Sequence, residues 1–208
     1  MAKTPPSRLT ADLAPMTKNR LEAFSDGVLA IIITIMVLEL RVPHGAELSA
    51  LRPLLPALGS YLLSFVYLAI YWNNHHHMLH ATNRVNGRVL WANMHLLFWL
   101  SLVPFVTGWM GENHFRKAPT ALYGTILLLA AIAYWILQNS IIRVEGPDSV
   151  LKKAVGRDVK GYLSIGLYAI SVPLSFWLPV LAWAIYVLVA LIWIIPDRRI
   201  ERVLEEMG

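Results

Sequence analysis

A single carboxylate at the start of a long apolar segment is the residue most suited to chemistry in this sequence. Asp26 directly precedes the apolar run 27–38. An ionisable group at membrane depth costs about 2.5–3.5 kcal/mol on insertion scales, so it usually faces a bundle interior or a water path. We expect Asp26 to be a buried hub, with Arg20 or His75 supplying the compensating charge or donor. The alternative is a carboxylate at a wet interface, stabilised there by the helix dipole.

A second group of titratable residues lies in the next apolar segment. It consists of His75, His76, His77 and His80. His76 and His80 have the i, i+4 spacing that can seat a metal, and histidine is also the natural proton sensor. No carboxylate lies nearby in the sequence, and successive helix positions do not all face one ion. We interpret the cluster as structural or interfacial, with pH modulation as the alternative, and we predict no metal site.

Glu39 follows the apolar run at its other end. There it could contribute to an acidic outer vestibule that raises the local cation concentration. A surface ion pair with Arg41 is an equally good interpretation. The sequence also contains no phosphate-binding loop, no serine or histidine triad, no paired carboxylates and no cysteine. We therefore predict neither an enzyme nor a cofactor.

The composition indicates where these residues lie. Of the 208 residues, 57% are hydrophobic and 15% are charged, whereas soluble domains have about 45–50% and about 25%. These values exclude a disordered chain, a coiled coil and a nucleic-acid-binding domain, and the net charge of +5 follows no single basic stripe. The sequence predicts an all-α integral membrane protein.

Six apolar helices account for the hydropathy pattern. A span needs about 20 residues, and the charge-free windows 53–83, 89–111 and 118–142 each supply one. The window 161–196 is too long for one helix, and Pro173 and Pro179 near its middle favour two short helices. We predict a single transmembrane domain over residues 1–208, with helices at about 20–42, 53–80, 89–111, 118–142, 161–176 and 179–195.

Lysine and arginine set the orientation of these helices. Of the 18 basic residues, 14 lie on the side of the two termini and 4 on the opposite side. The positive-inside rule therefore places both termini in the cytoplasm. We expect a multi-pass protein of the cell (inner) membrane whose first helix is retained.

The first helix is apolar all round, so periodicity does not show which of its faces has a role. The spacing i, i+3, i+4, i+7 collects one set of residues on one side, namely Ile31, Thr34, Ile35 and Leu38. Taken alone, this spacing favours a helix packed inside a bundle.

The start of this helix resembles a family of ion channels. Residues 20–27 read RLEAFSDG, and an arginine followed after three residues by Phe-Ser-Asp resembles the signature of the transmembrane protein 175 family of potassium channels. The match is dense over residues 20–43. Looser matches follow at Trp72, His75, Asn93 and residues 102–105. Since the sequence has one six-helix unit, it resembles the prokaryotic form.

The resemblance implies a homotetramer around one pore lined by the first helix. It places the narrowest level at Ile31, with further pore-facing positions at Thr34, Ile35 and Leu38. It also implies hydrogen bonds that tie the first helix to the second and third, from a set that comprises Arg20, Phe24, Ser25, Asp26, His75 and Asn93. The family varies in whether its second constriction is threonine or a bulky aliphatic residue, so Thr34 and Ile35 stay alternatives.

The residues themselves limit how such a pore selects ions. No segment reproduces a TVGYG-type loop, so a filter of backbone carbonyls is not expected. A ring of four isoleucines would instead dewet and block ions when closed. Potassium loses water more easily than sodium, so we predict a potassium-preferring channel of weak to moderate selectivity. The alternatives are a proton-coupled secondary transporter that uses Asp26 and the histidines, and a structural scaffold.

Overall fold

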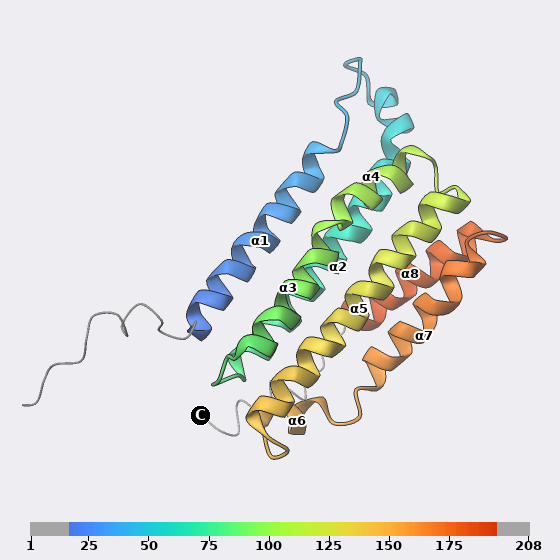
Figure 1. The fold of residues 1–208 in the computed structure, drawn as a ribbon. Coiled ribbons are helices and arrows are strands. Elements are labelled where there is room, and N and C mark those ends of the chain that lie inside the picture. The colour runs from blue at the N-terminus through green and yellow to red at the C-terminus, as the bar shows by residue number, and fades with distance from the viewer. Residues whose placement is uncertain (1–16, 195–208) are drawn as a thin grey trace, which may run out of the picture.

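The computed structural model describes residues 17–194, and this part of the chain is a bundle of helices without strands (Figure 1). The predicted all-α class is therefore confirmed. The elements in chain order are α1 (Lys18–Leu38), the 3-10 helix η2 (Leu48–Leu54), α2 (Leu55–His80), α3 (Gly87–Ser101), α4 (Val103–Glu112), α5 (Lys117–Glu145), α6 (Val150–Val155), α7 (Val159–Leu174) and α8 (Pro179–Ile194).

Four stretches of the described chain are long and apolar enough to cross a membrane. They are Lys18–Leu38, Leu48–His80, Gly87–Glu112 and Lys117–Glu145. α7 and α8 are apolar but have 16 residues each, which gives a length of about 24 Å against a hydrocarbon core of about 30 Å. A multi-pass membrane protein is supported, and the count of six spans stays a prediction.

Proline explains where two predicted helices differ from the structure. α1 ends at Leu38 instead of residue 42, and Pro43 disfavours helical backbone at the residue before it. The predicted helix 89–111 consists of α3 and α4, which meet at Leu102. The cause is Pro104, which has no N–H to donate to the carbonyl four residues earlier.

Smaller differences occur elsewhere. The predicted helix 53–80 begins with the 3-10 turn η2, which contains Pro53, and α2 proper starts at Leu55. The short helix α6 was not predicted; it is N-capped by the Ser149 hydroxyl, which accepts a hydrogen bond from the N–H of Lys152. Residue 195, the predicted end of the last helix, lies outside the described residues.

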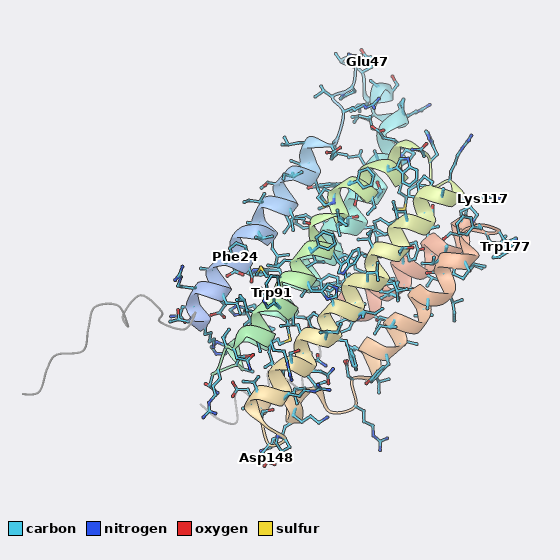
Figure 2. The ribbon with its side chains drawn as sticks, in the orientation of Figure 1. Phe24, Glu47, Trp91, Lys117, Asp148 and Trp177 are labelled. Atoms are coloured by element: carbon cyan, nitrogen blue, oxygen red, sulfur yellow. The ribbon has the colours of Figure 1, made fainter. Side chains whose placement is uncertain are left out.

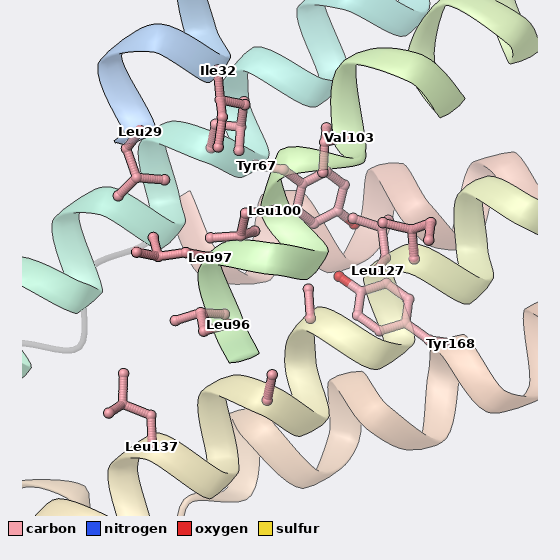
Figure 3. Close-up of a cluster of buried hydrophobic side chains, with 14 of the residues drawn as sticks. Leu29, Ile32, Tyr67, Leu96, Leu97, Leu100, Val103, Leu127, Leu137 and Tyr168 are labelled. Carbon is pink, nitrogen blue, oxygen red and sulfur yellow. The ribbon is translucent and has the colours of Figure 1, made fainter. Parts of the chain in front are cut away.

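The helices pack around a core in which α5 is central. α5 contacts α3, α4, α7 and α8, whereas α1 contacts α2, α3 and α4 and lies at the edge of the bundle (Figure 1). Figure 3 shows part of the buried core that these contacts create, including Leu29 and Ile32 of α1 and Leu97 and Leu100 of α3. α1 therefore has one face inside the bundle and one outside it.

Polar side chains inside the bundle are hydrogen-bonded to one another across helices. The Ser64 hydroxyl lies 2.6 Å from that of Thr107 and 2.9 Å from that of Tyr123. The Tyr67 hydroxyl donates to the carbonyl of Tyr186 at 2.5 Å. Since hydrocarbon offers no alternative partner, such bonds between helices are how a membrane bundle satisfies its polar groups.

The two ends of the bundle differ in charge. In Figure 2, Asp148 lies at one end, and Glu47, Lys117 and Trp177 lie at the other. The end with Asp148 also carries the start of α1, and we call it the basic end because 9 described lysines and arginines lie there, against 4 at the opposite end. The orientation, with both termini in the cytoplasm, stays a prediction.

Candidate functional site

One face of α1 is buried against its own subunit. The buried residues are spaced by three or four, as one face of a helix requires; they are Leu21, Ser25, Leu29, Ile32 and Met36. This face fixes the rotation of α1 about its axis, which the uniformly apolar sequence did not reveal.

The opposite face of α1 is uncovered. Ile31 is 58% exposed, Ile35 42% and Leu38 79%, and Thr34 is exposed as well. At 100° per residue, the other three lie within about 60° of Ile31 around the helix axis. Ile32, about 100° away from Ile31, is buried. The four residues that the resemblance assigns to a pore thus share one accessible face.

The Thr34 hydroxyl is oriented by its own helix. It donates a hydrogen bond to the carbonyl of Ile31 at 2.9 Å. Because its hydrogen is used in this bond, the lone pairs of the oxygen stay available, and a hydroxyl oxygen with free lone pairs is an acceptor for a cation. This geometry suits the replacement of water oxygens around an ion.

A groove with a volume of about 420 Å³ runs between α1 and the α3–α4 segment. Its lining residues are Val28, Ile31, Ile32, Ile35, Glu39, Ser101, Pro104 and Phe105. Glu39 reaches α4 at Gly108, where an added Cβ would lie 3.4 Å from the Glu39 Oε2 atom. The suggested ion pair of Glu39 with Arg41 does not form, because Arg41 pairs with Glu112 at 2.9 Å.

Three predicted anchoring residues meet behind α1 in a buried chain of hydrogen bonds. The Asn93 amide donates to the Ser25 hydroxyl at 2.9 Å, and the Ser25 hydroxyl donates to the carbonyl of Leu21 at 2.8 Å. His75 Nε2 lies 2.7 Å from the Asn93 side-chain oxygen. Since an amide oxygen only accepts, His75 donates from Nε2. The chain joins α1, α3 and α2.

Asp26 lies outside that chain. It is half-buried, and its Oδ1 accepts a hydrogen bond from the Trp72 indole at 3.0 Å. Neither Arg20 nor His75, the partners expected from the sequence, bonds to it in the described part of the chain. The buried polar residue on α1 is instead Ser25, because one residue along a helix is a rotation of about 100°.

Arg20 and Phe24 are exposed on α1, and within residues 17–194 the side chain of Arg20 makes neither a hydrogen bond nor an ion pair. The structure therefore does not bring these two residues into the anchoring chain.

The histidines of α2 do not converge on one point. His75 faces the interior, whereas His76 is exposed and stacks between Trp72 and His80, with ring centroids 6.1 Å apart on both sides. Among the described residues no three histidine, aspartate or glutamate side chains are placed to hold a metal ion. The sequence did not predict Trp72 as the partner of Asp26. The resemblance had nevertheless marked Trp72 on the second helix, and its indole N–H is a hydrogen-bond donor.

The described fold is similar to that of a solved ion channel. The structure resembles the crystal structure of a lysosomal potassium-selective channel TMEM175 homolog from Chamaesiphon minutus, with a TM-score of 0.74 and 28% identity. The match covers 86% of this chain and 97% of that one.

Sequence comparison gives the family. The family described as "Endosomal/lysosomal potassium channel TMEM175" matches residues 20–104. A potassium channel of Chryseobacterium sp. is 57% identical over 191 residues, which are 92% of this chain and 100% of the relative. A potassium channel of Streptomyces collinus is 30% identical over 176 residues, or 75% of this chain and 84% of that one. The chain belongs to the TMEM175 family, as its first helix predicted.

Proposed function

We propose that this protein is a homotetrameric, potassium-preferring cation channel of the cell membrane, with a pore lined by α1. The observation that carries the proposal is the uncovered apolar face of α1, which a single subunit leaves without a partner. Membership of a family whose relatives are named potassium channels supports it.

Small residues on the same side of α1 favour close approach between copies. Ala23, Gly27, Ala30 and Thr34 are all exposed, and apart from the adjoining residues and backbone of α1 no heavy atom lies within 4 Å of the position that a Cβ on Gly27 would take. Helices in membranes associate through such small residues, because their backbones can come close together. The groove beside α1 provides the matching space for side chains of a neighbouring copy.

Ile31 forms the constriction in this account. Four copies of its side chain at one level make a ring that is too narrow and too apolar to stay wet, so ions are blocked until the ring widens. The Thr34 oxygen, one turn further along, then offers a partial substitute for lost water. Glu39 beyond Leu38 supplies the acidic vestibule.

The anchoring chain gives the pore helix a rigid support. Ser25 and Asn93 are fully buried and His75 almost so, and their hydrogen bonds fix α1 relative to α2 and α3. Because the exposed face of α1 is only partly covered by its own subunit, this chain and the buried apolar face decide where Ile31 points.

Flux through purified protein in liposomes tests the proposal. Potassium should move down its gradient at channel rates without a proton gradient, and liposomes without protein should show no such flux. Native mass spectrometry of the same preparation should give the mass of four copies. A saturable flux that collapses with the proton gradient would establish a coupled transporter instead, and the absence of any flux would leave a scaffold.

A further inference from the structure

α1 presents a different surface on each side of its proposed pore-facing residues. On one side, Ala23, Ala30 and Val37 are exposed and lie about 80–120° around the helix axis from Ile31. We call these three residues the α1 flank. The groove between α1 and the α3–α4 segment lies on the other side, where Ile35 is about 40° away from Ile31.

A stripe of exposed aromatic side chains borders this groove on α3 and α4. It consists of Trp91, Phe98 and Phe105, each of which is more than half exposed. Their spacing of seven residues keeps them on one side of the helical segment. Phe105 itself lines the groove. We call these three residues the aromatic stripe.

A ring of identical subunits needs two such surfaces. In a closed ring every interface is heterologous, which means that two different surfaces of the same chain meet. The homotetramer proposed above, on which this inference rests, therefore requires one contact surface on each side of the pore-facing residues. The α1 flank and the aromatic stripe meet this requirement, because Ile31 lies between them.

The two surfaces also match in their position along the bundle. α1 runs beside α3 and α4 in the same direction (Figure 1). The hydrogen bond between Ser25 and Asn93 joins residues 68 positions apart, so a residue of α1 is level with the residue 68 positions later. Rotation about the pore axis keeps every residue at its level. Across an interface between copies, the level pairs are Ala23 with Trp91, Ala30 with Phe98, and Val37 with Phe105.

Each of these pairs sets a large ring against a smaller side chain. Helices in membranes approach closely where one of them presents small residues. Gly27 lies between Ala23 and Ala30, and it is exposed too, so α1 leaves room for the rings along this side. Large side chains at one level then fit between small ones as knobs fit into holes.

Charge at the basic end is complementary as well. Arg88 is exposed on α3, one turn before Trp91, and Glu22 directly precedes Ala23 on α1. By the same offset the two charges are two residues from level, which is about 3 Å along the axis. Within residues 17–194 neither has an ion-pair partner. A neighbouring copy supplies each with one.

We propose that the aromatic stripe of one copy packs onto the α1 flank of the next copy. Phe98 of each copy covers Ala30 of its neighbour, and the groove beside the stripe receives the edge of the neighbouring α1. Because Ile31 lies between the two surfaces, closing the ring through them directs Ile31 of every copy towards the common axis.

Disulfide formation between copies tests this contact. The chain has no cysteine, so introduced pairs are free of background. Two differently tagged full-length copies, one with Ala30→Cys and the other with Phe98→Cys, are co-expressed and oxidised in the membrane with copper phenanthroline. We expect a linked product that carries both tags. The control pairs Ala30→Cys with Leu188→Cys, an exposed site on α8, and should give none.

An exchange of side-chain size tests the same contact without a disulfide, and it decides the matter if the cysteine variants fail to assemble. Ala30→Phe fills the space of the neighbouring ring and should weaken each interface about tenfold, which is about 1.4 kcal/mol. Adding Phe98→Ala to the same chain should restore assembly. Leu188→Phe introduces the same ring outside the interface and should leave assembly unchanged. Native mass spectrometry measures the share of protein in four copies.

The outcomes separate this interface from the channel proposal. A four-copy mass in the unchanged protein, with no disulfide between positions 30 and 98 and no effect of Ala30→Phe, would overturn the interface and leave the tetramer in place. A single-copy mass in the unchanged protein would overturn the homotetramer and this inference together.

Discussion

Asn93→Ala removes the central link between α1 and the rest of the bundle. In the variant the N–H of His75 Nε2 loses its acceptor and Ser25 loses its donor. Ser25 keeps its bond to the carbonyl of Leu21, so the main penalty falls on the imidazole. Its Nδ1 atom has no partner among the described residues, and the ring would be left with no hydrogen bond there.

The expected magnitude follows from burial. A buried donor without an acceptor costs about 1–3 kcal/mol, and Asn93 and His75 are 0% and 1% exposed. We therefore expect Asn93→Ala to lower the free energy of unfolding by about 2 kcal/mol. Titration with sodium dodecyl sulfate in mixed micelles, followed by tryptophan fluorescence, measures this change.

A double-mutant cycle isolates the hydrogen bond from the loss of volume. In the Asn93→Ala background, His75→Leu removes the orphaned donor, so the two changes together should cost less than their sum. The coupling should be about 0.6 kcal/mol and at most about 1.7 kcal/mol, the mean and the maximum measured for such bonds within membranes. Asn139→Ala is the matched control, because that amide bonds only within its own helix. Strictly additive costs would refute the anchoring chain.

Three other substitutions test separate parts of the account. Asp26→Ala orphans only the Trp72 indole, so it should destabilise by about 1 kcal/mol in the same titration; a cost above that of Asn93→Ala contradicts this ranking. Gly124→Ala places a Cβ in steric overlap with the Tyr186 hydroxyl of α8 and should cost about 1–3 kcal/mol. Gly166→Ala, with open space around it, should be neutral or stabilising; equal melting temperatures of the two variants would be inconsistent with this packing. Glu39→Gln should lower potassium conductance at low salt and hardly at high salt, since screening removes the effect; a loss that persists at 1 M salt rules out a vestibule charge.

Composition and local sequence predicted the class of fold well. Charge-free windows located the apolar segments, and the two prolines of the last window marked the turn between α7 and α8. The break at Leu102 was missed because Pro104 falls inside a window whose composition is otherwise that of one span, and α6 was missed because six residues with two lysines carry no hydropathy signal.

The site was harder to read from sequence for a physical reason. An apolar helix has no periodicity to fix its rotation, so the buried position could not be assigned to Ser25 in place of Asp26. Trp72 is 46 residues from Asp26, and the anchoring chain combines side chains of three helices. Such long-range pairings depend on how helices pack, which single-segment patterns do not encode.

The ion preference of an Ile31→Asn channel tests whether α1 lines the pore. Reversal potentials under opposing potassium and sodium gradients are recorded for the unchanged protein, Ile31→Asn and Ile33→Asn; Ile33 lies about 200° from Ile31 on the half-buried side of α1. We expect Ile31→Asn to hydrate the ring and to erode the preference for potassium. It should also raise the leak current about tenfold, which is equivalent to lowering the barrier by about 1.4 kcal/mol. Ile33→Asn should instead impair folding and leave the ion preference of any assembled channels intact. Unchanged current and unchanged preference in Ile31→Asn would contradict a pore lined by α1.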